Sequence, residues 1–202
     1  MAKLKAPLLS LGASGAIGKA LVFFNWKGLD VVREYVIPSN PKSDDQITQR
    51  GFLIEAVSRI HLAEALAADE LDAADKIAYA LYGSIFATPR TWFNTIVKNM
   101  VDCRVAGNSP CILCNGELSV STPAEITFTG KLYTPLTEEG DVYWGVSKTN
   151  MPHSLIANSA AGDIDATASV TIKGTRYYFQ WRARDTSSIA GMRSGIYHAV
   201  ST

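Results

Sequence analysis

The part of the chain that follows residue 110 consists of short stretches of alternating polar and apolar residues, separated by turn signals. In RYYFQWRA, Tyr177, Phe179 and Trp181 share one side of an extended chain, because successive side chains point to opposite faces of a strand. Similar stretches recur at the spacing of an antiparallel sandwich. They read ELSVS, EITFTGKLY, DVYWGVSK, ATASVTIK, TRYYFQWRARD and SGIYHAV. This pattern leaves little choice of fold for the C-terminal half, and we expect a β-sandwich.

The middle of the chain has helical periodicity instead. Apolar residues recur at helical spacing over about residues 44–66, and a second helix is expected over about 70–82, beginning near Asp69. A third helix is expected to begin with Thr88 as N-cap and Pro89 in the first helical position. The three segments favour a three-helix bundle.

The segment GNSP, residues 107–110, marks the change from helical periodicity to the alternation of strands. The predicted fold class is therefore α+β. We expect two domains: residues 1–110, with an N-terminal arm, a β-hairpin and the helices, and residues 111–202, forming the sandwich.

Residues 19–37 predict the hairpin. ALVFFNW and LDVVREYVI are rich in β-branched and aromatic residues, and Lys27–Gly28 lies where a tight turn is needed. Both faces of such a hairpin are apolar. It is either an ordinary central hairpin or a surface that packs on its own helices on one side and on a neighbouring subunit on the other. For the second case the candidate partner-binding residues are Leu21, Phe23, Phe24, Trp26, Val32 and Tyr35.

The stretch GASGAIG suggests another function. Gly12, Gly15 and Gly18 follow a short apolar run, and GASGAIGKAL resembles the opening of short-chain dehydrogenases. That resemblance implies a nicotinamide cofactor on a strand, glycine turn and helix. However, the residues after Gly18 favour a strand, and no alternating βαβ series follows. We therefore expect no enzyme and no cofactor, with the dehydrogenase as the alternative.

Composition excludes several partners. Lysine plus arginine and aspartate plus glutamate both number 19, so no net charge favours nucleic acid or an anionic membrane surface. No apolar run approaches the roughly 20 residues of a membrane helix. We expect neither nucleic acid nor membrane as a partner, and synthesis in a cytoplasm.

The cysteines are Cys103, Cys111 and Cys114, and CILC has the spacing of a metal knuckle or a redox pair. Structural zinc needs four ligands, and no second C-x-x-C or paired histidine accompanies this one. We expect buried thiols and no metal. GDIDAT, with Asp163 and Asp165, has a faint likeness to a calcium loop, but a turn between strands is expected there.

The C-terminal half resembles fibronectin type III domains. IKGTRYYFQWRA is similar to their E–F corner and F strand, where a tyrosine hydroxyl bonds back to the main chain. Gly174 and Tyr177 match that motif. The resemblance implies a fold and almost nothing about function. Tyr143 and Trp144 are candidates for stacking on sugar rings, in an adhesion module that binds carbohydrate.

The N-terminal half, GAIGKALVFFNWKGLDVVREYVIPSNPKSDDQITQR, resembles virion structural proteins of tailed bacteriophages. The motifs are V-F-x-x-W-K-G and V-R-x-Y-V-x-P-x-N-P, followed by a polar run that ends in Gln49 and Arg50. The resemblance implies a virion subunit made in the host bacterial cytoplasm, either a capsid decoration protein or a tail or collar component. Its implied partners are other virion proteins, copies of itself and host surface glycans.

Overall fold

The computed structural model describes residues 2–3, 14–37, 40, 42–122, 124–133, 138–157, 159, 161–170 and 172–201. Contacts divide the chain into two compact units, Met1–Ser43 and Asp44–Thr202. The expected boundary near residue 110 is not where this division falls. The helices and the sandwich share one hydrophobic core, so they belong to the same unit.

The N-terminal unit is a four-stranded antiparallel sheet in the order β1-β4-β3-β2. Its centre is the predicted hairpin, closed by Lys27 (φ 52°) and Gly28 (φ 76°). Two consecutive residues with positive φ form the type I′ turn that matches the twist of paired strands. Asn25 stabilises the turn by accepting a hydrogen bond from the Gly28 N–H at 3.1 Å. The strands are β1 (Ala2–Lys3), β2 (Gly15–Ile17), β3 (Leu21–Trp26) and β4 (Leu29–Glu34).

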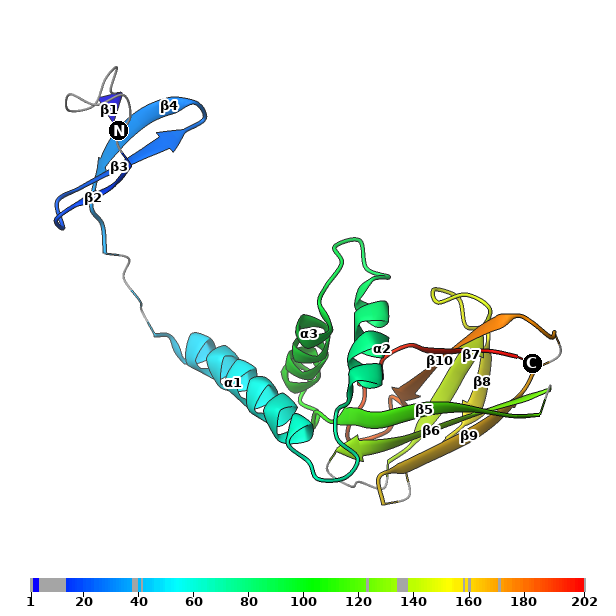
Figure 1. The fold of residues 1–202 in the computed structure, drawn as a ribbon. Coiled ribbons are helices and arrows are strands. Elements are labelled where there is room, and N and C mark those ends of the chain that lie inside the picture. Colours follow the sequence, from blue (N-terminus) through cyan, green and yellow to red (C-terminus); the bar gives the residue numbers. More distant parts are fainter. Residues whose placement is uncertain are drawn as a thin grey trace. The chain divides into compact units, whose positions relative to one another are not determined.

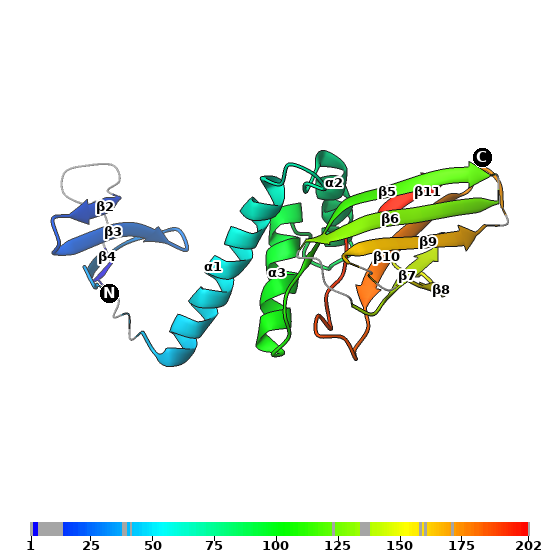
Figure 2. The ribbon, with the colours of Figure 1, turned by 90° about the horizontal axis from the view of Figure 1, so that it is seen from below.

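Three helices open the second unit: α1 (Asp44–Glu64), α2 (Ala73–Gly83) and α3 (Trp92–Val105). They lie at one end of the β-sandwich (Figures 1 and 2), and α3 packs against both α1 and α2. Helix α3 begins later than expected, because the side chain of Thr91, not Thr88, accepts the Asn94 N–H. Helix α2 also begins later than expected, because its N-cap is Asp72 and not Asp69, and Asp72 forms a capping box with Asp75.

The rest of the second unit is an antiparallel β-sandwich of a three-stranded sheet, β5-β6-β9, and a four-stranded sheet, β11-β10-β7-β8. One strand, β8, was not predicted, since it has only four residues and its polar start hides the alternation. The strands are β5 (Ile112–Thr122), β6 (Glu125–Tyr133), β7 (Gly140–Gly145), β8 (His153–Ile156), β9 (Asp163–Ser169), β10 (Arg176–Ala183) and β11 (Tyr197–Val200).

This strand order is that of fibronectin type III domains. The fourth strand of the sandwich, β8, pairs with β7 rather than joining the β5-β6-β9 sheet, as the fourth strand of an immunoglobulin constant domain would. The predicted tyrosine corner is present. The Ile172 N–H donates to the Tyr177 hydroxyl at 3.3 Å, and Gly174 turns the chain with φ 70°. The fibronectin-like sandwich and the α+β class are therefore confirmed.

Helix α2 is attached to the sandwich by the buried carboxylate of Asp75. Its Oδ1 accepts hydrogen bonds from the Tyr197 hydroxyl (2.5 Å) and the Gly116 N–H (2.9 Å). Its Oδ2 accepts the Asn115 N–H (2.7 Å) and the Asp72 N–H (3.3 Å). Helix α2, β5 and β11 are thus joined at Asp75, whose side chain is 0 % exposed.

A bulge in β5 makes this convergence possible. Register shifts between Cys114 and Glu117, where Asn115 takes φ 50°, so that two consecutive N–H groups turn toward Asp75. Gly116 is required, because a Cβ atom there would lie 2.2 Å from the Tyr197 ring. One turn along α2, the Tyr79 hydroxyl bonds both the N–H and the C=O of Leu113 at 3.3 Å.

Replacing Asp75 with asparagine tests this attachment. All four neighbours of the carboxylate are donors, so an amide NH₂ would face donors and leave buried groups unsatisfied. We expect Asp75→Asn to lower the free energy of unfolding by about 2–3 kcal/mol in urea titrations. The exposed Asp165 on β9 provides the control, and Asp165→Asn should change stability by less than about 0.5 kcal/mol. Equal stability of the two variants would contradict the assignment.

Helices α1 and α3 are joined by Glu55. Its carboxylate accepts hydrogen bonds from Arg104 Nε (2.9 Å) and Nη2 (2.5 Å) and from Arg59 Nε (3.0 Å). The hydrogen bonds from Arg104 hold the pKa of Glu55 below its ordinary value of 4.5. Because this pKa is lower in the folded state than in the unfolded chain, the contribution to stability is present above about pH 4.5 and disappears as the pH falls through the folded-state value.

We therefore expect Glu55→Gln to lower Tm by about 2–4 °C at pH 7 and to have little effect near pH 3. Thermal unfolding followed by circular dichroism at the two pH values measures this. Glu125→Gln, at an exposed position on β6, is the control. A Tm difference that persisted unchanged at low pH would show that Glu55 contributes through packing and not through its charge.

Candidate functional site

The N-terminal sheet carries the residues predicted to bind a partner. The register pairs Phe23 with Val32 and Phe24 with Val31, so one face contains Phe23 and Val32 and the other contains Phe24 and Val31. Both Phe23 (6 %) and Val31 (5 %) are nearly inaccessible although they lie on opposite faces. Each face of the sheet therefore has its own apolar centre.

The predicted residues differ in their access to a partner. Trp26 is 54 % exposed, Leu21 43 % and Tyr35 37 %, whereas Phe24 and Val32 are half-buried. Phe23 is buried, so it supports the sheet from within and is not available at the surface. Further exposed apolar residues, which sequence reasoning missed, extend the set: Ile17, Leu29, Val36 and Ile37.

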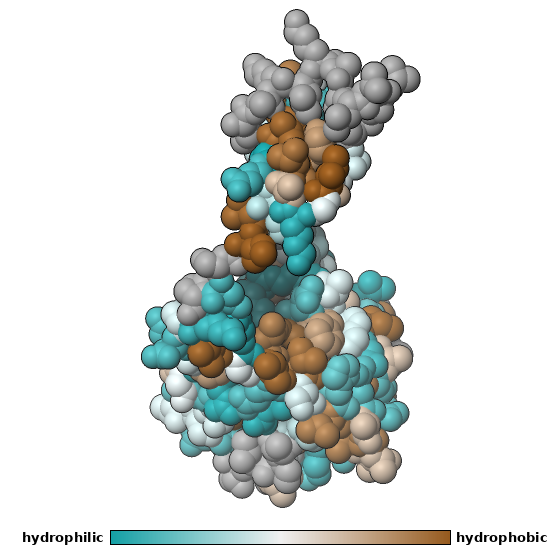
Figure 3. Space-filling view, turned by 90° about the vertical axis from the view of Figure 1, so that its left-hand side faces the viewer, coloured by the Kyte–Doolittle hydropathy of each residue, from teal (hydrophilic) through white to brown (hydrophobic). Residues whose placement is uncertain are grey.

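We call the four exposed apolar strand residues of this unit, Ile17, Leu21, Trp26 and Leu29, the docking patch. Ile17 is opposite Leu21 on the face of the sheet that carries Phe23, and Trp26 is opposite Leu29 on the face that carries Phe24. The docking patch therefore consists of two cross-strand pairs, one on each face of the sheet. Apolar side chains appear among polar ones on the surface of this unit (Figure 3). Pairing of Ile17 with Leu21 could not be read from the sequence, because it requires β2, which was not predicted.

The glycine-rich stretch has a different environment from that of a dinucleotide loop. Gly15 begins β2, and Gly18 (φ 57°) lies in the tight connection from β2 to the antiparallel β3. Gly12 lies outside the described residues. A phosphate loop needs a helix N-terminus after the glycines, and here the chain after Gly18 enters a strand. The geometry that the nicotinamide alternative requires is not formed by residues 14–26.

The three cysteines are buried free thiols, as predicted. Burial raises the pKa of Cys111 and Cys114 far above the ordinary value, so both remain protonated and poorly nucleophilic. Asp163 and Asp165 belong to β9, so the prediction of a turn at these two residues was wrong. The turn lies just before the strand, at Ala161–Gly162. Among the described residues no cluster of three acidic, histidine or cysteine side chains has metal-binding geometry.

Tyr143 and Trp144 do not form a free platform for sugars. Trp144 is stacked on His153 (centroids 4.3 Å apart) and on Phe179 (6.2 Å), and it packs against the sandwich core. The ring of Tyr143 lies under the guanidinium group of Arg182, 4.4 Å from its centroid. Both aromatic rings are therefore occupied by contacts within the chain.

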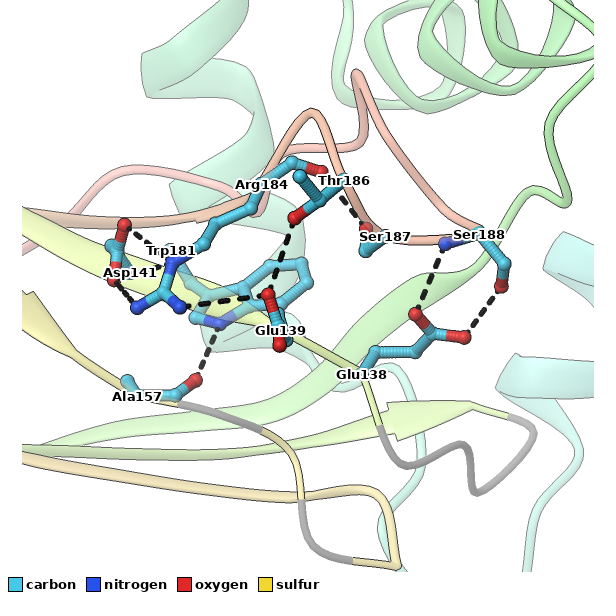
Figure 4. A network of polar contacts seen from close by, with 9 residues as sticks. All are labelled: Glu138, Glu139, Asp141, Ala157, Trp181, Arg184, Thr186, Ser187 and Ser188. Carbon is cyan, nitrogen blue, oxygen red and sulfur yellow. Dashed lines mark hydrogen bonds and ion pairs between the residues drawn. The ribbon is translucent and has the colours of Figure 1, made fainter.

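A polar network fixes the segment that follows β10 to the start of β7 (Figure 4). Arg184 binds Asp141 through Nε (3.1 and 3.2 Å) and Nη2 (2.6 Å), and its Nη1 lies 3.6 Å from Glu139. The Thr186 hydroxyl donates to the same glutamate at 3.2 Å. These contacts raise the pKa of Arg184, with Asp141 as the main cause.

The far end of this segment is held by Glu138. Its carboxylate accepts the Ser188 N–H at 3.2 Å and the Ser188 hydroxyl at 2.5 Å (Figure 4). The Ser188 carbonyl in turn accepts the Ser109 N–H at 2.9 Å, which connects the segment to the chain that follows α3. Below the network, Trp181 Nε1 donates to the Ala157 carbonyl at 3.0 Å, so the underlying sheet is also fixed.

Comparison with known proteins gives little beyond the fold. No protein-family model and no curated protein matches the chain. Among solved structures, it is similar to the fn3 domain of human contactin 1, with 13 % identity over 46 % of this chain and 78 % of the other and a TM-score of 0.36. It is also similar to a bromine derivative of BhCBM56, with 9 % identity over 42 % and 88 % of the two chains and a TM-score of 0.32.

A further similarity is to the sensor domain of the anti-sigma factor RsgI4 in Pseudobacteroides cellulosolvens, with 18 % identity over 46 % of this chain and 95 % of the other and a TM-score of 0.33. Scores of this size carry no functional argument, and the sandwich is assigned from its own strand order. Among the described residues, no helix is long and apolar enough to cross a membrane.

The network predicts that Glu138 restrains the segment at Ser188 without contributing to the core. The Ser188 N–H and hydroxyl donate to different oxygens of Glu138. Glu138→Gln replaces one of these oxygens with an NH₂ group, so the two donors no longer each have an acceptor. We expect severalfold faster hydrogen exchange at the Ser188 amide with an unchanged Tm. Glu125→Gln on β6 should change neither. Unaltered exchange in Glu138→Gln would show that the segment is fixed by its other contacts.

Proposed function

We propose that this chain is a structural subunit, not an enzyme, and that it joins an assembly through the docking patch of its N-terminal sheet. The observation that carries the proposal is a small sheet with apolar residues on both faces. The unit spans Met1–Ser43, and units of this size usually depend on disulfides, metals or association for stability. All three cysteines lie in the other unit, and no metal-binding cluster occurs among the described residues, so we attribute the stability of this unit to association.

We propose that the second unit, with the helices and the sandwich, is the part of the subunit that does not mediate association. Its helices and sandwich share one continuous core, so it needs no neighbour to fold. The assembly that we propose is the virion of a tailed bacteriophage, as a capsid decoration or a tail or collar component. That part of the proposal rests on the resemblance of the N-terminal motifs, in which Trp26, Lys27, Gly28 and Tyr35 take part. Copies of this chain and other virion proteins are the proposed partners.

Sedimentation velocity of the full chain tests the association. We expect oligomers that grow with concentration, and an increase of at least tenfold in the dissociation constant for a variant carrying Leu21→Ser and Trp26→Ser, because both apolar contacts are lost. Ile156→Ser is the matched control, since Ile156 is 74 % exposed but belongs to β8. NAD or NADP in excess should change neither the oligomer nor its Tm.

Two results would contradict the proposal. The first is a wild-type chain that remains monomeric up to about 100 μM, well above a micromolar dissociation constant. The second is a rise in Tm with NAD or NADP, which would restore the dehydrogenase alternative. Circular dichroism of the double variant verifies that the sheet still forms, so that loss of association is not mistaken for loss of folding.

A further inference from the structure

Arg182 lies on the outer face of the four-stranded sheet and forms no ion pair with any carboxylate that the structure describes. Its neighbour across the strands, in register, is Asp141 on β7, but that carboxylate is bound on two sides by Arg184. Among the residues that the structure describes, no acidic side chain forms an ion pair with Arg182. A half-buried guanidinium group without an opposite charge is unusual, because buried charges are normally paired.

The arginine is nevertheless held in one orientation. Its Nε donates to Gln180 Oε1 at 3.0 Å, and the Gln180 amide in turn donates to the Ser194 carbonyl at 3.0 Å. Gln180 is 1 % exposed, so this support is rigid. The Tyr143 ring supports the guanidinium plane from 4.4 Å. Within the described part of the chain, Nε is the one nitrogen of this group with a hydrogen-bond acceptor, which leaves the terminal N–H groups available.

A second cation lies beside the first. Arg193 is opposite Arg182 in an isolated antiparallel bridge and is exposed to solvent. Burial and the charge of Arg193 both lower the pKa of Arg182. Two neighbouring positive groups repel each other unless an anion lies between them. Among the described residues no carboxylate forms an ion pair with Arg182 or Arg193, so an anion from outside the chain would relieve this repulsion.

There is room for such an anion. A hollow of about 330 Å³ opens beside Arg182, large enough for a single sugar-sized group. Arg193 does not line this hollow, so it would act on the anion through its charge and not by direct contact. Asp141 and Asp185 at its wall would repel an extended polyanion, whereas one anionic group on an otherwise neutral ligand avoids them. The lining residues are Asp141, Tyr143, Arg182, Ala183, Arg184, Asp185 and Thr186.

We propose that Arg182, assisted by Arg193, binds the carboxylate or phosphate group of a small ligand that enters this hollow. The free fork of terminal N–H groups matches the two oxygens of either anion, which is the geometry in which arginine binds most strongly. The site lies in the sandwich unit and uses no residue of the docking patch. The test of anion binding is therefore independent of the test of association.

Titration of the full chain with inorganic phosphate, glucuronate and glucose tests the site. Arg182 Nε–H resonances followed by NMR should shift in a saturable way with phosphate or glucuronate and should not respond to glucose. The tighter of the two anions identifies phosphate or carboxylate as the preferred group. The absence of a saturable shift with both anions would overturn the proposal.

Variants separate binding from structure. Arg182→Met should weaken anion binding at least tenfold, and Arg193→Met should weaken it less. Because these variants remove the reporter or its neighbour, their binding is measured by calorimetry. Arg176→Met is the matched control, since Arg176 is an exposed arginine on the same strand, and it should bind as the wild type does.

If Arg182→Met fails to fold, Arg182→Lys keeps the positive charge but loses the fork, and it should retain the wild-type Tm with severalfold weaker binding. Wild-type affinity in a folded Arg182 variant would contradict the proposal. It would show that Arg182 serves only to pack on Tyr143.

Discussion

The second unit depends on one buried carboxylate with four hydrogen-bond donors around it. Asp75 is part of the cap of α2, and it also binds the bulge of β5 and the hydroxyl of Tyr197 on β11. Burial raises the pKa of this carboxyl group, and the hydrogen bonds act in the opposite direction. A charged group in this position is stable only where every lone pair is used. That requirement fixes α2, the bulge and the last strand relative to one another.

On the outer face of the sandwich, two arginines differ in whether their charge is balanced. Arg184 has its charge balanced by Asp141 and Glu139, and the result is a fixed segment between β10 and the bridge at Arg193. Arg182, two residues earlier on the same face, has an ordered support, but no described carboxylate balances its charge. The first arrangement stabilises the fold, while the second is arranged to receive a charge from a ligand.

The N-terminal unit follows another constraint, which is size. A short sheet gains little from burial when its apolar residues are divided between two faces, as Phe23 and Val31 are. Its exposed pairs, Ile17 with Leu21 and Trp26 with Leu29, are the surface that association would remove from water. The sandwich unit has no such need, because its helices and sheets share one core.

Local patterns in the sequence determined much of the secondary structure, but they missed β1, β2 and β8. Alternation predicted β6 and β10, Lys27–Gly28 predicted the hairpin turn, and Gly174 with Tyr177 predicted the tyrosine corner, because each depends on neighbouring residues alone. Long-range packing decided the rest. Strand β8, the joining of helices to the sandwich through Asp75, and the difference between Arg182 and Arg184 all depend on residues distant in the chain, and no local period encodes such contacts.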